Sequence, residues 1–453
     1  MISDSEQRQL ETELDASEAD IRYNTLQELA ELCRTRKLKL EPESQAHNLH
    51  CHTFCSYNGY GYSPGRIAFL AKKSGWFAAG IVDFDVLDAV DEFRQAAELL
   101  NIRYSAGMES RVFVKELADR EINSPGEPGV AYHLGLGFTS GTVPASAEKF
   151  AARLRSQAAA RTRRIVEAVN GFLDPLRIDF DADAARLTPH GNVTERHVCQ
   201  AYREKAEALW PDAEKRASFW AGKLGLGLDE AAKLLGNPVK LEGAIRSKTM
   251  KKGGAGYIAP TPETFPPIEE MNRFVLDCGA IPTIAWLNGL SGGERDPEAL
   301  LALHAAKGAA MLNIVPDRNW NVADPEKRAR LVAELNRIVA ACEKTDMPIV
   351  VGTEMNAPGL KLVDDFDCDA LRPHVGRFVS GAAILTAHTL LAPLGRGYLS
   401  GWAASAFRTK AEKNAFFDRF GRLVTPGRFR AVTVWPESPA EMLNRADAIA
   451  CAN

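Results

Sequence analysis

The sequence predicts an α/β protein organised as a β/α barrel, and three observations carry this prediction. From about residue 47, short apolar runs alternate with amphipathic stretches, which is the rhythm of repeated β-α units. Several apolar runs end in histidine or a carboxylate, as in barrels whose functional groups lie at the carboxyl ends of the strands. The chain has 453 residues and is 45% hydrophobic, so it can bury a sizeable core.

The first part of the chain is predicted to form helices and then strands. Residues 5–37 place leucines at helical spacing without the alternation of a strand, so we expect a helical extension over 1–45. Residues 46–144 are interpreted as the first part of the barrel. Its expected strands lie at 77–82, 103–114 and 130–138, with a helix at 86–100.

The strand signals fade over 145–255, where long amphipathic stretches predict an inserted helical lobe. The second part of the barrel is expected over 256–400, followed by a C-terminal helical segment over 401–453. Expected strands of this second part lie at 280–286, 309–315 and 347–355, and expected helices at 297–307 and 325–344. The Pro- and Gly-rich stretch 251–267 is predicted to be a loop leading back from the lobe, although its basic start leaves a phosphate contact as an alternative.

Charge and composition exclude some classes of partner. The chain has 55 basic and 59 acidic residues, a net charge of −4, which gives no electrostatic reason to expect a nucleic acid or an anionic membrane. The first twenty residues are too acidic for a signal peptide, and no apolar run reaches the roughly 18 residues of a membrane span. We therefore expect a cytoplasmic protein. The eight cysteines form no CxxC motif and are expected to be small buried residues.

Residues 48–58, NLHCHTFCSYN, raise the possibility of a metal site. Alternate residues of a strand point to the same face, so the imidazoles of His50 and His52 could reach one ion; a chance pair is the alternative. Further candidates stand at the ends of later apolar runs. They are Asp83, Asp85, Glu109, His133, His197 and Glu354. Each alone has an ordinary explanation as a helix cap or a satisfied polar group, so the interpretation depends on their joint positions.

The order of these motifs resembles the PHP superfamily of metal-dependent phosphoesterases. The series is HCHT at 50–53, VDFD at 82–85, GMES at 107–110, YHLGLG at 132–137, ERH at 195–197 and GTEMN at 352–356. The likeness covers about 47–365 and is similar to the small members that carry a helical insertion. The resemblance implies a distorted seven-stranded β/α barrel that binds up to three divalent metal ions and hydrolyses phosphate esters.

The resemblance also implies which residues would bind metal. The first ion would be held by His50, His52, a bridging Glu109 and Glu354, the last standing where the family usually has Asp. The second ion would use Glu109, His133 and His197. The third set is replaced by Tyr57, Phe84 and Asn356, and an aromatic ring cannot take the place of an imidazole ligand. Two divalent ions are therefore expected, and these ligands suit Zn, Mn and Fe alike.

Another departure concerns the substrate. The AHP motif of the family is written AWL here, which puts Trp286 where a histidine is expected and removes any proton transfer by that side chain. Arg196 is predicted to contact phosphate because its planar fork matches two oxygens, although it could instead pair with a carboxylate in the lobe. The predicted substrate-binding residues are Arg196, Trp286, Tyr57 and Asn356, and the predicted catalytic residues are Glu109 and Arg196.

Two functional hypotheses follow from different classes. The first is a hydrolase of small-molecule phosphate esters with a two-metal centre, in which the ions supply hydroxide and stabilise charge on the phosphoryl oxygens. The alternative is a catalytically silent barrel that binds a metal or a ligand as a regulatory module, which the replaced site positions favour. A nucleic-acid processing module is disfavoured by the acidic balance and by the lack of a partner domain.

Overall fold

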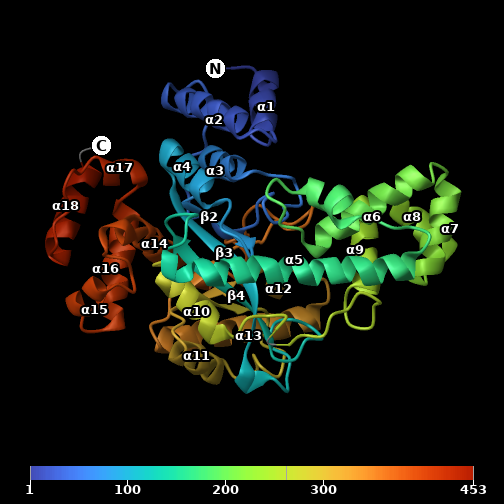
Figure 1. The fold of residues 1–453 in the computed structure, drawn as a ribbon. Coiled ribbons are helices and arrows are strands. Elements are labelled where there is room, and N and C mark those ends of the chain that lie inside the picture. The colour runs from blue at the N-terminus through green and yellow to red at the C-terminus, as the bar shows by residue number, and fades with distance from the viewer. Residues whose placement is uncertain (1, 262, 452–453) are drawn as a thin grey trace.

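A seven-stranded sheet forms the centre of the molecule in the computed structural model, which describes residues 2–261 and 263–451 (Figure 1). Strand order in the sheet follows the order of the strands in the chain. The strands are β1 (His47–Cys51), β2 (Ala78–Phe84), β3 (Arg103–Phe113), β4 (Val130–Phe138), β5 (Ile281–Trp286), β6 (Met311–Ile314) and β7 (Ile349–Val351). Strand β4 is antiparallel to β3 and β5, and the other neighbouring strands pair in parallel.

The sheet curls until its first and last strands meet. The amide of His52 donates to the carbonyl of Glu354 at 2.8 Å, and the amide of Glu354 donates to the carbonyl of His50 at 2.7 Å. These two bonds form a parallel bridge between Cys51 and Glu354. The nearly closed barrel with one reversed strand confirms the predicted distorted seven-stranded β/α barrel.

Helices cover the outside of the barrel, and their starts follow local sequence signals. They are α3 (Pro64–Lys73), α4 (Val90–Leu100), α10 (Ile268–Asp277), α11 (Pro297–Ala306), α12 (Asp317–Trp320), α13 (Pro325–Lys344) and α14 (Val375–Leu391). Helices α3, α11 and α13 each begin with proline, after a serine or aspartate whose side chain accepts a backbone N–H of the first turn. Proline at this position has no N–H to leave unpaired, so each start is locally fixed.

Helix α14 packs against the barrel as a core helix. Among the described residues, the stretch Arg372–Leu394 is long and apolar enough to cross a membrane. However, 78% of its most apolar 18-residue segment is buried inside the protein. Gly381 faces the carbonyl of Ile349 so closely that an added Cβ would lie 1.8 Å from the oxygen, and Gly421 of α16 (Lys410–Leu423) approaches the carbonyl of Ala383 in the same way. These two glycines let three layers of backbone pack without side chains between them.

The remaining helices lie at the two ends of the chain and in the segment between β4 and β5. Helices α1 (Asp4–Glu13) and α2 (Ala19–Arg34) pack outside α3 and α4. At the other end of the chain, α16 packs on α14 and α18 (Pro439–Cys451) packs on α16, while α17 (Pro426–Arg430) contacts α4 and α15 (Gly401–Ala406) lies near α16 (Figure 1). The segment between β4 and β5 contains α5 (Ala145–Leu173), α6 (Glu195–Leu209), α7 (Ala213–Leu224), α8 (Leu228–Leu235) and α9 (Pro238–Thr249).

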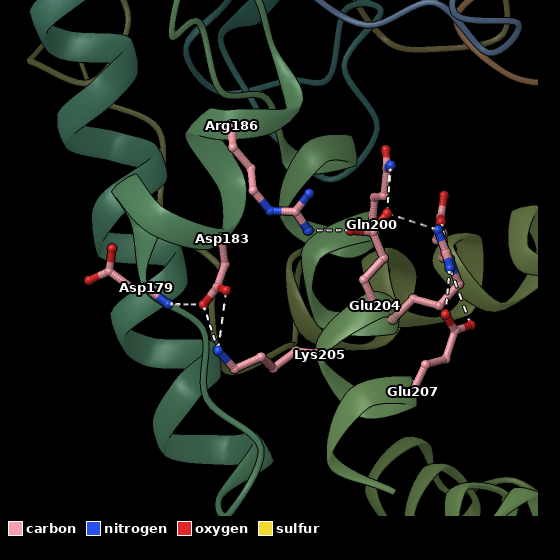
Figure 2. Close-up of polar contacts among 9 residues, drawn as sticks. Asp179, Asp183, Arg186, Gln200, Glu204, Lys205 and Glu207 are labelled. Carbon is pink, nitrogen blue, oxygen red and sulfur yellow. Dashed lines mark hydrogen bonds and ion pairs between the residues drawn. The ribbon is translucent and has the colours of Figure 1, made fainter. Parts of the chain in front are cut away.

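Helices α6 to α9 and the second half of α5 form a lobe with its own hydrophobic cluster, which includes Val169, Tyr202 and Trp220. On its surface, ion pairs tie the turns before α6 to α6 itself (Figure 2). Lys205 donates to the Asp183 carboxylate at 3.1 Å, and Arg186 pairs with Glu204. Exposed pairs of this kind each contribute about 0 to 1 kcal/mol, so burial in the cluster, and not surface charge, stabilises the lobe.

Candidate metal centre

Three ligand atoms meet inside the barrel at the carboxyl end of β1. The Nε2 atoms of His50 and His52 lie 3.6 Å and 3.1 Å from Oε2 of Glu109 on β3. All three side chains are buried, and their candidate ligand atoms lie within 4.8 Å of one another. Within the described part of the chain these three atoms have no hydrogen-bond partner of good geometry. Buried polar atoms without partners are costly, so the convergence of these three fits a binding site for a divalent cation.

The hydrogen bonds of the two histidines leave Nε2 free in both rings. Nδ1 of His50 lies 2.8 Å from the side-chain oxygen of Asn313, which can only accept, so Nδ1 carries the proton. Nδ1 of His52 lies 3.4 Å from the hydroxyl oxygen of Ser56, which already donates its proton to Asp83 and therefore accepts. In each ring the remaining lone pair is on Nε2 and points to Glu109, as a metal ligand requires.

Asp83 organises the loop that follows β1. Its carboxylate accepts the backbone N–H of Thr53 at 2.7 Å, the Thr53 hydroxyl at 2.6 Å and the Ser56 hydroxyl at 2.6 Å. The side chain is 1% exposed. Asp83 thus does not enter the triad, but it fixes the hydroxyl that orients His52.

Electrostatics keep the Glu109 carboxylate of the triad ionised. Burial opposes ionisation of Glu109, but the charge and hydrogen bonding of His50 and His52 outweigh it and lower the pKa of Glu109 to about 2. The Glu109 carboxylate is therefore ionised at neutral pH. Two imidazole nitrogens and one carboxylate are a donor set that binds Zn, Mn or Fe, so the residues fit a divalent ion.

Glu354 lies beside the triad but is held by other partners. Its carboxylate pairs with Arg318 at 2.6 Å and accepts the side-chain amide of Asn356 at 2.5 Å. Its backbone is left-handed, with φ of 69°, and the next residue, Met355, has φ of 56°. Because its carboxylate is engaged by Arg318 and Asn356, Glu354 is a neighbour of the three converging ligands and not one of them.

His133 is not brought to the centre. In the β3–β4 register Leu134 pairs with Glu109, whereas His133 pairs with Ser110. Paired residues of neighbouring strands share a face, so His133 points to the opposite side of the sheet from Glu109. There its Nε2 lies 2.6 Å from the side-chain oxygen of Asn272 on α10. The expectation that His133 and Glu109 share an ion does not agree with this register.

His197 is also engaged elsewhere. It lies at the third position of α6, where its Nδ1 accepts the backbone N–H of Thr194 at 3.1 Å as part of a capping box. Burial lowers the pKa of His197 to about 3, so the ring is neutral and its proton is on Nε2. This tautomer offers no free lone pair to a metal, in contrast to His50 and His52.

The predicted substrate residues line one cavity above the triad. Its volume is about 630 Å³, and His50, Glu109 and Asn313 form part of its wall. Arg196, Trp286, Tyr57 and Asn356 all line it, together with Phe84. Phe84 stacks on the ring of His52 with centroids 4.2 Å apart. Trp286 pairs in register with Ile314 and not with Asn313, so it leaves β5 on the face opposite to that of Asn313 and reaches the cavity from the end of the strand.

The cavity is rich in cations. Seven basic side chains line it against five carboxylates; the basic ones are Arg111, Arg161, Arg196, Arg246, Lys251, Lys252 and Arg318. Arg246 and Lys251 share Glu195, at 2.7 and 2.8 Å. Arg196 has no carboxylate partner among the residues that the structure describes and lies 5.8 Å over the ring of Tyr57. The pairing of Arg196 with a lobe carboxylate, the alternative drawn from the sequence, is therefore absent over the described chain.

Comparisons with known proteins give distant matches in structure and none in sequence. No family model matches the chain, and no curated protein matches it. An amidohydrolase from Chromobacterium violaceum, solved with sulfate and without metal, aligns over 71% of this chain and 91% of its own, with 16% identity and a TM-score of 0.47. A Bifidobacterium adolescentis protein described as a metal-dependent phosphoesterase aligns over 74% and 98%, with 19% identity and a TM-score of 0.45. At these values the assignment of the centre rests on its own geometry.

Proposed function

We propose that this protein is a metal-dependent hydrolase of small-molecule phosphate esters. The observation that carries the proposal is the convergence of His50, His52 and Glu109 on one buried point that faces a cation-rich cavity. A divalent ion held there would lower the pKa of a bound water and polarise a phosphoryl oxygen. The surplus of basic side chains matches the negative charge of a phosphate ester.

The side chains around the triad would bind and orient the ester. The guanidinium of Arg196 has its fork free for two phosphoryl oxygens, and Tyr57 beneath it restricts its movement. Arg318 is 46% exposed and held in place by Glu354, so it presents a second positioned cation. Burial raises the pKa of Tyr57 to about 12, which keeps its hydroxyl protonated and able to donate a hydrogen bond.

The number of ions is part of the proposal. The orientation of the lone pairs supports one ion at the triad. A second ion shared by Glu109, as the resemblance implies, would require His197 to change its tautomer and His133 to reach the other face of β4. We therefore propose a single high-affinity ion, with any second ion bound more weakly.

The openness of the cavity supports an enzyme over a silent barrel. In a silent barrel, the aromatic residues that replace the third set of metal ligands would close the site, and Phe84 and Tyr57 would fill the space above the triad. Instead both rings form part of the wall of a cavity of about 630 Å³. Stacking on such rings could contribute about 0.5 to 1.5 kcal/mol per contact, which favours esters with a planar leaving group.

The proposal is tested by metal content and by turnover. Elemental analysis of protein purified without added metal should give close to one ion per chain. A panel of aryl and alkyl phosphate mono- and diesters is then assayed with Mn or Zn for the wild type, His52→Ala and the matched control His133→Ala, which removes a buried imidazole from the opposite face. Activity that is lost in His52→Ala and kept in His133→Ala supports the proposal. A metal-loaded protein that hydrolyses no ester would leave the silent barrel as the better account.

A further inference from the structure

Asn313 is a buried polar residue in the middle of β6 and contacts the metal triad from behind. It is 2% exposed, and its side-chain oxygen accepts from Nδ1 of His50 at 2.8 Å. Its side-chain N–H donates to the carbonyl of Val350 on β7 at 3.4 Å. Because the amide nitrogen faces a carbonyl, the orientation of the amide is fixed with its oxygen toward His50. Asn313 thus selects the tautomer of His50 in which Nε2 is free.

The two histidines of the triad have different supports. Behind His52 stands the Ser56 hydroxyl, which donates to the side chain of Asp83, so this support ends in a carboxyl group. Behind His50 stands only the neutral amide of Asn313. A carboxylate behind a metal-bound histidine makes the ring more basic and a stronger ligand, whereas an amide orients the ring and adds less electron density.

We propose that Asn313 is a positioning residue that sets the metal affinity of the centre through His50. The inference rests on the proposed function, because it assumes that the triad holds a divalent ion. Removal of the amide oxygen frees His50 to rotate and to change tautomer, which weakens metal binding. Replacement of the amide by a carboxylate strengthens metal binding.

The chain contains a matched control for this effect. On the opposite face of the sheet, Nε2 of His133 lies 2.6 Å from the side-chain oxygen of Asn272, whose N–H donates to the carbonyl of Lys307 at 2.7 Å. The two pairs have the same chemistry and the same burial. They differ in that His133 does not face the triad, so the same substitutions at Asn272 should leave metal affinity unchanged.

The experiment measures Zn and Mn dissociation constants by competition with a chromophoric chelator, in the absence of any ester. Wild type is compared with Asn313→Ala, Asn313→Asp, Asn272→Ala and Asn272→Asp, and far-UV circular dichroism checks folding. We expect about 10- to 100-fold weaker binding in Asn313→Ala, about tenfold tighter binding in Asn313→Asp, and wild-type binding in both Asn272 variants. Asn313→Gln, whose longer side chain displaces the acceptor, should weaken binding in the same way and replaces the alanine variant if that variant does not fold.

Wild-type affinity in Asn313→Ala or Asn313→Gln would overturn the inference, as would equal changes at Asn272. A wild-type protein that binds neither Zn nor Mn would overturn the proposed function as well. The two failures are distinguishable, because the expected affinity series in a protein that hydrolyses no ester would support the role of Asn313 while contradicting the phosphoesterase.

Discussion

Replacement of Asp83 tests how strongly the loop behind the metal centre is tied to the sheet. In Asp83→Ala, the backbone N–H of Thr53 and the hydroxyls of Thr53 and Ser56 lose a common acceptor. None of these groups is exposed to solvent, so the variant leaves buried donors that water cannot reach. We therefore expect the loop to become less stable and the ring of His52 to lose its fixed orientation.

The size of the effect follows from the three bonds. A hydrogen bond to a charged group contributes about 1.5 to 3 kcal/mol, so three bonds at the low end contribute about 4.5 kcal/mol. Burial raises the pKa of Asp83, which means that the cost of keeping this carboxylate ionised away from water offsets part of that contribution. We expect Asp83→Ala to lower the free energy of unfolding by about 3 to 4 kcal/mol.

The assay is urea unfolding followed by far-UV circular dichroism, with Zn affinity measured on the same samples. The matched pair is Asp83→Asn and Asp85→Asn, since both remove one charge from the end of β2. Asp85 is 3.5 Å from Arg161 and lies at the cavity wall, so its variant should change stability by about 1 kcal/mol or less. A loss below about 1 kcal/mol in Asp83→Ala would refute the reasoning, as would equal effects of the two asparagine variants.

Three further predictions concern charge. Glu109→Gln should weaken Zn binding by more than Glu354→Gln in the same chelator competition, because Glu354 already pairs with Arg318. Burial disfavours the protonated form of His50, but Glu109 outweighs it and raises the pKa of His50 above 6.5, so Zn affinity should fall as the pH drops through that raised value. Burial raises the pKa of Glu294 to about 7 from 4.5, so the folded state binds this proton more tightly than the unfolded state. The free energy of unfolding, from urea titrations, should therefore fall as the pH rises through that window, and Glu294→Gln should flatten the slope.

The sequence predicted the barrel because its signals are local. Runs such as 280–286 and 347–355 are short, apolar and followed by polar residues, and serine or aspartate before proline marks where α3, α11 and α13 begin. The face of the sheet to which a strand residue points is harder to predict, because it depends on contacts between distant parts of the chain. The stretch around His133 is apolar and glycine-rich without clear alternation, so its facing depends on the register with β3, which no short motif specifies.

One supporting residue of the centre, Asn313, was missed, and Asp83 was a candidate whose supporting role was not predicted, although a signal for both exists. Asn313 interrupts the apolar run 309–315, and Asp83 follows directly on the apolar run 77–82. A polar side chain inside a buried strand must find a partner, so each position was a candidate for contact with another polar residue. Which partner it finds depends on strands that are distant in the sequence. The backbone is left-handed at both Glu354 and Met355, a conformation that non-glycine residues rarely adopt and that no local sequence signal indicates.

Helix α5 belongs to both the barrel and the lobe and connects them rigidly. Its 29 residues form a rod about 43 Å long, and Figure 1 shows it running from the side of the barrel to the far helices of the lobe. Leu154 packs in the cluster of the barrel, Val169 packs in that of the lobe, and Arg161 and Ile165 between them line the cavity. A rotation of the lobe would have to bend this rod in its middle. The width of the cavity is therefore set when the protein folds, and the protein should discriminate between ligands by their size and not by closing around them.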